Sequence, residues 1–402
     1  MFNPYFLMAA LYAGLAVLGA LDTSTSSLNL VQAVNGIRWL RVHFITLGMM
    51  TEVIFGFLTI VAAARSHQRR AVRWDIWALL NTGLVILLIG IPMVNQLLIL
   101  SGGTLIFVAA ALVSWQLMGQ SASTETAKQP MRGRWFYLAG LAYLLLGVLV
   151  GTGLWLGWTA TLGIQTPLEV HIHANNWGFL SLVFAGLIVD FYPTFAGRSL
   201  AWPRSIRPIF WLMLFGALGL VVGPWFQLKP PTAAGLVAHA VATVWLLANV
   251  IKPLWRGGSA WTAGMWHLVT SYVWLFAPVI FAPFVLLRVA GFPAATVEQN
   301  APQALIYGWV LQFGFAIIPF IFRYVLLPDE TPRLGGNWLS LIAVHTGGIF
   351  LWASIFVADY QSTLHGIAYA LWLIALLPIV VELWQILQDK RTHLEQVADA
   401  KA

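Results

Sequence analysis

The chain has 402 residues, of which 60% are hydrophobic and only 9% are charged. A soluble domain usually has about 25% charged residues, so this chain cannot cover a globule with polar side chains and its outer solvent must be lipid. Cysteine is absent, which excludes thiolate metal sites, iron–sulfur clusters and disulfides. Any metal or cofactor must therefore be held by His, Met, Tyr or carboxylate side chains.

Apolar stretches long enough to cross a bilayer follow one another along the whole chain. A transmembrane helix needs roughly 20 apolar residues, and Gly, Pro and charge clusters separate the candidates. Residues 1–20 are expected to stay as a first span, because no short cleavable leader is visible. We predict an all-α polytopic membrane protein with about twelve spans. They lie at 5–23, 37–64, 75–97, 100–119, 135–158, 169–195, 207–226, 234–254, 263–288, 302–327, 338–357 and 363–387.

Basic residues gather after the even-numbered spans, which predicts that these loops and both termini are cytoplasmic. The same pattern explains the formal net charge of +7 without nucleic acid, and nucleic-acid binding is not expected. We expect a multi-pass protein of a bacterial or archaeal inner membrane. The basic residues concerned are Arg65, Arg69, Arg70, Arg73, Lys128, Arg132, Arg134, Arg198, Arg204, Arg207, Lys252, Arg256, Arg333, Lys390, Arg391 and Lys401.

An internal repeat divides the chain. A polar residue followed by small residues five and thirteen positions later occurs three times, at two equal intervals along the sequence. The three sets are His43, Gly48 and Gly56; His173, Gly178 and Gly186; and Gln303, Gly308 and Ala316. Each set opens the second span of a four-span unit, and its small residues permit close helix approach in lipid. The alternative is a chance match in Gly-rich helices. We predict one membrane domain of pseudo-repeats 1–130, 131–260 and 261–390, with 391–402 a polar tail, and we expect the stretch 388–402 to be solvated and frayed.

Histidines at the repeated positions are the candidate site. His43 and His173 are predicted at similar depth near the outer leaflet, where two neutral imidazoles on neighbouring helices can hold a haem iron between them. His171 is two residues before His173, about 200° away around a helix, so both cannot face one cofactor. We assign His173 to the site shared with His43. His171 is expected to face a second site or a helix interface.

Two arginines precede His43 at the outer end of its span, where the general charge pattern predicts few basic residues. Arg38 and Arg41 would suit the propionates of a haem, because Arg pairs with carboxylates in a bidentate manner. The alternative is that their side chains snorkel to lipid phosphate. That alternative is favoured for Arg38, and the two explanations are balanced for Arg41.

The remaining polar residues within the spans are weaker candidates. His239, His267, His345 and His365 are each predicted inside a span; any of them could complete a second haem or metal site with His171, or be an ordinary interior histidine. Glu52, about 13 Å deeper than His43 by helix rise, could relay protons or be a neutral packing residue.

These residues resemble subunit I of the haem–copper oxidases. That family has twelve spans in three four-helix units, a haem-ligating His near the outer end of span 2, and a His-x-His helix that serves two haems. The stretch HIHANNWGFLSLVFAGLIVDFYP is similar to the corresponding helix of cbb3-like members, and the chain also resembles NnrS-type haem proteins associated with nitric oxide. His43 matches the span 2 ligand. His171 and His173 match the His-x-His pair, although in unit two, whereas the oxidases carry it in unit three.

The resemblance implies one or two haems, most simply b-type, near the periplasmic face, in an oxidoreductase related to oxygen or nitric oxide reductases. Copper is not expected, because the histidine pair for it is missing from the seventh span and Gln303 stands where the pattern has His. The protein partners would be a periplasmic electron donor such as a cytochrome c, and further membrane subunits. A secondary transporter and a non-catalytic subunit of a respiratory complex remain alternative functions.

Overall fold

The structure is a computed structural model that describes residues 3–25, 37–65, 72–119, 131–255 and 261–399. Within these ranges every regular element is helical. In this part of the chain eleven helices are long and apolar enough to cross a membrane, and a further apolar helix, Trp74–Gly90, is shorter. The chain is therefore an all-α polytopic membrane protein by its architecture.

The elements run in chain order with the following bounds. They are α1 (Pro4–Thr25), α3 (Ile37–His43), η1 (Phe44–Met50), α4 (Thr51–Arg65), α5 (Trp74–Gly90), α6 (Gln96–Met118), α7 (Arg134–Leu156), α8 (Pro167–His173), η2 (Ala174–Leu180), α9 (Ser181–Ala196), η3 (Pro203–Ser205), α10 (Ile206–Phe226), α11 (Lys229–Leu254), α12 (Ala263–Thr270), α13 (Tyr272–Leu286), α14 (Ala294–Gln303), η5 (Ala304–Val310), α15 (Leu311–Leu326), α16 (Trp338–Phe356), η6 (Ala358–Tyr360) and α17 (Gln361–Asp399).

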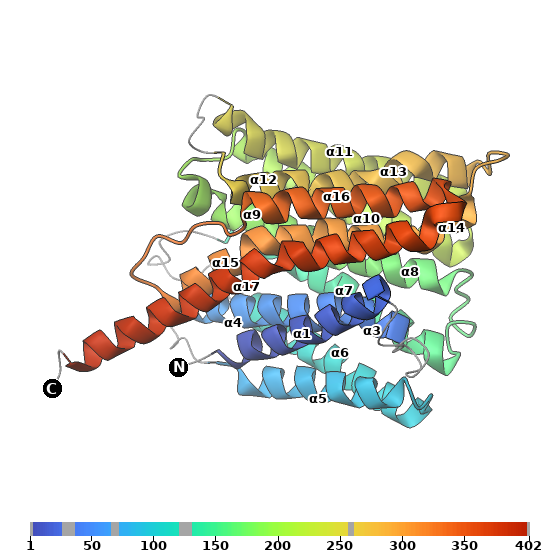
Figure 1. Ribbon diagram of the computed structural model, residues 1–402. Coiled ribbons are helices and arrows are strands. Elements are labelled where there is room, and N and C mark those ends of the chain that lie inside the picture. The colour runs from blue at the N-terminus through green and yellow to red at the C-terminus, as the bar shows by residue number, and fades with distance from the viewer. Residues whose placement is uncertain (1–2, 26–36, 66–71, 120–130, 256–260, 400–402) are drawn as a thin grey trace. The chain divides into compact units, whose positions relative to one another are not determined.

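The chain forms two compact units, within each of which the long helices run side by side (Figure 1). The first unit comprises residues 1–14, 30–192 and 199–252, and the second comprises 15–29, 193–198 and 253–402. The expected repeats 1–130 and 131–260 fall largely in the first unit, and 261–390 falls in the second.

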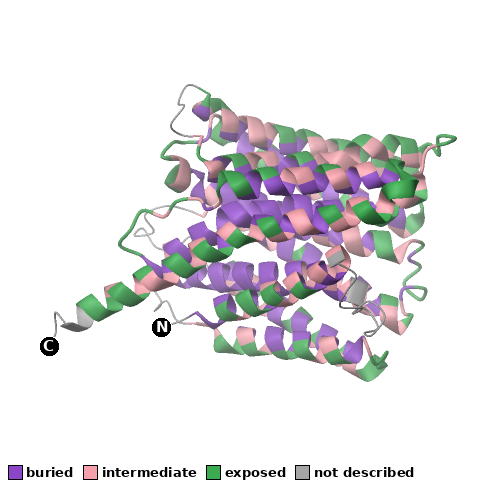
Figure 2. Ribbon diagram, viewed as in Figure 1, coloured by how far each residue is buried: buried purple, intermediate pink, exposed green. Residues whose placement is uncertain are grey.

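Three spans are more deeply buried than all others, namely the ones that contain α4, α9 and α15. In their apolar stretches 83%, 72% and 100% of the residues are buried, against at most 56% in any other candidate span. Figure 2 shows the difference from helices such as α5 and α16, which alternate buried and exposed faces. A helix that is apolar and buried all round belongs to the interior of a bundle.

Each of these three spans contains a π-helical segment of seven residues in its first half. The segments η1, η2 and η5 begin at Phe44, Ala174 and Ala304, directly after His43, His173 and Gln303. Their starting positions are thus separated by the same constant interval as the sequence landmarks. Wide turns of this kind are rare and occur often at functional sites.

The glycine in each π segment faces an aromatic ring of the preceding span. A Cβ atom on Gly48 would lie 2.7 Å from Cγ of Tyr12, and one on Gly178 or Gly308 would collide with Tyr143 or Trp274. The small residues predicted at offset five therefore allow an aromatic side chain to lie directly on the helix backbone.

Several expected boundaries were wrong. The third span was placed at 75–97, but α5 ends at Gly90, because a turn through Pro92 and Val94, which has φ 51°, leads to a new helix capped by Asn95. The stretch 388–402 was expected to be solvated and frayed, yet α17 continues as helix to Asp399 and carries an exposed Arg391–Glu395 pair one turn apart.

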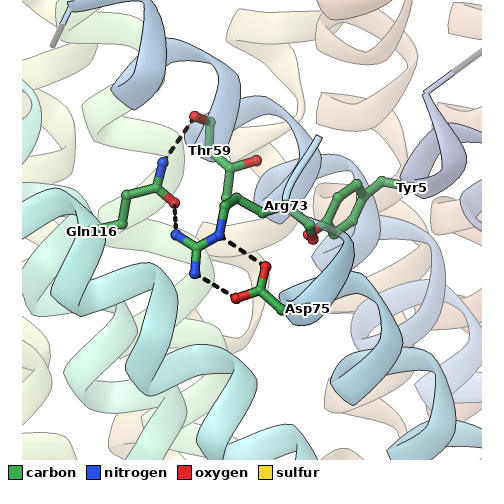
Figure 3. A network of polar contacts seen from close by, with 5 residues as sticks. All are labelled: Tyr5, Thr59, Arg73, Asp75 and Gln116. Carbon is green, nitrogen blue, oxygen red and sulfur yellow. Dashed lines mark hydrogen bonds and ion pairs between the residues drawn. The ribbon is translucent and has the colours of Figure 1, made fainter. Parts of the chain in front are cut away.

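A polar network fastens the ends of four helices in the first unit (Figure 3). Arg73 binds both oxygens of Asp75, at 2.8 and 2.6 Å, and donates to Gln116 at 3.1 Å. Gln116 in turn donates to the carbonyl oxygen of Thr59, and the Tyr5 hydroxyl donates to the carbonyl oxygen of Arg73. The network therefore joins α1, α4, α5 and α6 at the end of the unit away from His43.

Candidate functional site

Two histidine rings from different helices face each other in the first unit. The ring centres of His43, at the end of α3, and His171, on α8, are 6.0 Å apart with an angle of 26° between the planes. Both residues are half-buried. We take this pair as the centre of the candidate site.

The ring of His43 is held by Trp39, one turn earlier on α3. The Nδ1–H of His43 donates to the carbonyl oxygen of Trp39 at 2.7 Å, because a carbonyl can only accept. The indole of Trp39 also stacks on the imidazole, with ring centres 4.0 Å apart and planes 14° apart. One residue thus fixes both the tautomer and the rotamer of His43, which leaves Nε2 as the nitrogen with the lone pair.

The ring of His171 is held by α7 in an analogous way. Its Nδ1–H donates to the carbonyl oxygen of Gly147 at 2.8 Å. Gly151 makes room for the ring, since a Cβ there would lie 2.6 Å from Cε1 of His171. Asn175 donates to the carbonyl oxygen of His171 at 2.8 Å, one turn further on. As in His43, Nε2 carries the lone pair.

His173 does not share a site with His43, which corrects the assignment made from the sequence. Its Nδ1–H donates to the carbonyl oxygen of Leu220 on α10 at 2.7 Å. Residues two apart lie on nearly opposite sides of a helix, and the rotation of α8 turns His171, not His173, towards His43. His173, which contacts α10, therefore also has its lone pair on Nε2.

The two arginines near His43 are only partly described. Arg41 is half-buried on α3, two residues before His43. The side chain of Arg38 lies outside the described part of the structure, so the expectation for it stays a prediction.

Glu52 lies on α4 and is fully buried, with 0% exposure. Its polar neighbour is Asn81 of α5, which also accepts a hydrogen bond from the Tyr12 hydroxyl at 3.3 Å. Neither carboxyl oxygen makes a well-formed hydrogen bond with the described residues.

His239 is an interior histidine of α11 in the first unit. Its Nε2–H donates to the carbonyl oxygen of Trp177 at 3.1 Å, and its Nδ1 lies 3.3 Å from the hydroxyl of Thr243. Both nitrogens are occupied, so the residue fits packing better than ligation and the candidate role does not suit this arrangement.

Two further candidates, the buried His267 and the half-buried His345, make polar contacts in the second unit. Nε2 of His267 lies 2.8 Å from the hydroxyl of Ser340, and Nε2 of His345 lies 2.8 Å from the hydroxyl of Thr270. The amide nitrogen of Gln312 donates to Thr270 at 3.0 Å and lies 3.1 Å from Nε2 of His345. Each imidazole therefore already uses Nε2 in a hydrogen bond.

Gln303, at the third repeated position, accepts a hydrogen bond from another helix. The hydroxyl of Tyr369 on α17 donates to Oε1 of Gln303 at 2.7 Å. Gln303 thus has a partner of its own within the second unit. His365, the last candidate, is half-buried on the same helix α17.

The ring-centre distance of the His43–His171 pair, 6.0 Å, suits two imidazoles that would hold one metal ion between them. Two metal–nitrogen bonds of about 2 Å, with each nitrogen roughly 1 Å from its ring centre, place ring centres roughly 6 Å apart. Two imidazoles are too few for a zinc site, which takes three or four protein ligands, whereas haem iron needs only axial ligands from the protein. No group of three or more His, Cys, Asp or Glu residues is gathered for a metal within the described ranges.

The residues that orient the rings were not predicted from the sequence. Trp39 stands four residues before His43, a spacing that places side chains next to each other on a helix, so it could have been found. Gly147, Gly151 and Leu220 lie on other helices and act through backbone atoms or missing side chains, for which the sequence has no local signal.

No protein-family model matches this sequence, and no curated protein is significantly similar to it. The fold and the composition together define the class: a multi-pass membrane protein built entirely of helices in its described parts.

Proposed function

We propose that this chain is a membrane haem protein that resembles subunit I of the haem–copper oxidases and the NnrS-type proteins. The observation that carries the proposal is the His43–His171 pair, with rings 6.0 Å apart and each Nδ1–H bound to a backbone carbonyl. That hydrogen bond is the usual device for presenting Nε2 to a metal. A b-type haem suits the pair, because a chain without cysteine offers no thiolate for covalent attachment or ligation.

The ligand set bears on the chemistry. A haem supplies an iron that changes between two oxidation states, and an iron with two imidazole ligands has no open position for a gas. We therefore assign electron transfer to the His43–His171 site, with a periplasmic one-electron donor such as a cytochrome c as the partner. Chemistry on oxygen or nitric oxide needs an open position, for which a second haem on His173 is the candidate.

A threefold repeat explains why the pair is His43 with His171 and not with its equivalent, His173. In a rotational arrangement each copy meets the next through two different surfaces, so equivalent residues do not face each other. If one face of a helix contacts the next copy, then the residue that it contacts there lies on a different face from its own equivalent. His171 and His173, about 200° apart, supply both surfaces on one helix. The equal spacing of the three π segments along the chain supports such a repeat.

The test is the haem content of three single variants purified from cells supplied with haem. We expect the wild type to show a Soret band and a pyridine haemochrome of b-type haem. His43→Ala and His171→Ala should lose the low-spin spectrum of a bis-imidazole iron. His173→Ala, the matched control on the same helix, should keep that spectrum. A wild type without haem would refute the proposal, and loss of the low-spin spectrum only in His173→Ala would refute the assignment of residues.

One observation favours a second candidate function, a secondary transporter. The part-buried cluster of Thr270, Gln312 and His345 is the kind of polar group that lines a substrate path within a membrane. Uptake of a solute into proteoliposomes that survives His43→Ala but not Gln312→Leu would favour it. A non-catalytic subunit of a respiratory complex would be indicated by co-purifying subunits and by the absence of haem in the isolated chain.

A further inference from the structure

A buried carboxyl group without a well-formed hydrogen bond to the described residues lies in the interior of the first unit. Glu52 has 0% exposure, and neither of its oxygens makes a well-formed hydrogen bond with the described residues. Ionisable side chains at membrane depth are costly and mark functional positions by default. Without a cation or several donors around it, such a group is stable in its neutral form and expensive in its charged form.

Packing does not require a carboxyl group at this position. Glu52 lies nine residues after His43, and the residues nine positions after His173 and Gln303 are Leu182 and Gln312. All three side chains have 0% exposure. The same helix position is thus filled by an acid, an apolar side chain and an amide. Packing alone therefore does not explain the acid in the first repeat.

Two tyrosines of α1 lie near Glu52, and one of them reaches the end of the unit that the arginines assign to the cytoplasm. Tyr5 and Tyr12 of α1 both lie near enough to interact electrostatically with Glu52. The ring of Tyr5 packs on Gly56, one turn from Glu52, and its hydroxyl donates to the carbonyl oxygen of Arg73 (Figure 3). Tyr5 therefore spans the distance between the buried acid and the polar network of Arg73 and Asp75.

Other titratable groups in this unit do not compete for the role. The helix α6, which packs on α4, has no titratable residue. On α9, which meets α4 through Phe57 and Phe191, Asp190 accepts from the backbone N–H of Gly133 and from Tyr137, and the Tyr192 hydroxyl donates to the carbonyl oxygen of Val250. On α5, Asn81 faces Glu52 and cannot ionise, and Asp75 is bound by Arg73.

We infer that reduction of the iron held by His43 and His171 raises the proton affinity of Glu52, so that Glu52 takes up a fraction of a proton per electron near its titration point and releases it when the iron is oxidised. The inference rests on the proposed function. An external one-electron donor supplies the electron, and the carboxylate oxygen of Glu52 forms an O–H bond with a proton that enters from the Arg73 side past Tyr5. The proton that is taken up compensates part of the charge of the added electron.

The distance between the two groups sets the size of the effect. Glu52 is about 13 Å from His43 along the helix. One unit charge at that distance changes the proton affinity of another group roughly tenfold at an effective dielectric constant of about 20. By linkage, deprotonation of Glu52 makes reduction roughly tenfold less favourable, which is about 59 mV for one electron.

The test is the haem midpoint potential measured against pH in the full-length haem protein. The wild type should show a potential that falls by about 59 mV in total as the pH is raised through the titration of Glu52. Glu52→Gln and Glu52→Leu copy the residues of the other two repeats, so both should fold and bind haem. Their potentials should lack this pH-dependent step and agree with the low-pH value of the wild type.

A second readout reports the proton itself. The reduced-minus-oxidised infrared difference spectrum of the wild type should contain a carboxylic-acid C=O band that shifts in D2O and is missing in Glu52→Gln. An unchanged band and an unchanged pH step in Glu52→Gln would overturn this inference and leave the haem site standing. A wild type that binds no haem would overturn both proposals.

Discussion

At the scale of single residues, the site depends on backbone carbonyls that orient imidazoles. Trp39, Gly147 and Leu220 each accept from the Nδ1–H of one histidine, at 2.7 to 2.8 Å. Substitution of the side chain leaves a backbone carbonyl acceptor in place, unless the substitution also moves the helix. The side chains around these bonds, in contrast, can be tested one at a time.

Trp39 offers such a test, because its carbonyl and its ring act on the same histidine. Trp39→Ala should keep the Nδ1 hydrogen bond of His43 but lose the stacked ring, and haem affinity should fall roughly tenfold, the lower end of the range for residues that orient metal ligands. Trp39→Phe keeps an aromatic face and should restore most of the affinity. Haem titration of the apoprotein measures both values. Equal affinity in Trp39→Ala and the wild type would contradict a positioning role.

At the scale of elements, the three most buried spans share one construction. Each begins its interior course with a π segment, and each π segment contains a glycine on which an aromatic ring of the preceding span lies. Small residues allow such close contact, and in lipid this packing is a main source of helix association.

Gly48 is the position where this packing can be tested against a control on the neighbouring helix. Gly48→Ala places a Cβ 2.7 Å from Cγ of Tyr12, so Tyr12 or the helix must move. Overpacking of this kind costs typically 1–3 kcal/mol, and we expect about 2 kcal/mol. Gly14→Ala on α1 meets no atom within 4 Å and should be neutral or slightly stabilising. Unfolding in detergent by denaturant, followed by circular dichroism, compares the two; equal losses would contradict the packing argument.

At the scale of the whole molecule, few ion pairs are found among the residues that the structure describes, and one of them joins distant segments of the second unit. Arg323 of α15 binds Glu382 of α17 at 2.8 Å, with the two side chains 9% and 20% exposed. Glu382 also accepts from the backbone N–H of Gly336, and Arg323 donates to the carbonyl oxygen of Arg333. The pair therefore fastens two helices and the segment between α15 and α16.

Removal of one partner should be costly here and nearly neutral at the exposed pair. Glu382→Gln leaves the Arg323 guanidinium in the interior without a countercharge, and we expect a loss of about 3 kcal/mol, the lower end for buried pairs. Glu395→Gln removes the exposed Arg391–Glu395 pair, with side chains 74% and 59% exposed, and should cost less than about 0.5 kcal/mol. Thermal unfolding in detergent at matched pH measures both. Similar losses in the two variants would show that burial does not decide the strength of these pairs.

The sequence predicted the helices well, because span length and composition are local properties. It also showed the constant interval between His43, His173 and Gln303, and the π segments begin directly after these residues. The role of the histidines stays a prediction. The sequence did not predict which histidine faces His43, because the rotation of α8 is set by packing against α7 and α10. The length of α17 was missed because its last turns are polar in composition, although Arg391 and Glu395 can pair along the helix.

The wide turns of η1, η2 and η5 have a consequence for how this chain can vary. Each segment follows His43, His173 or Gln303 and precedes the buried remainder of its span. Its wide turns therefore set how far the helix before it is rotated relative to the helix after it. Loss of one residue there would rotate one part against the other by about 100° and point the imidazole of α8 away from its partner. The number of residues in these short stretches is therefore constrained more tightly than their identity, and variation in chain length should be found in the connecting loops.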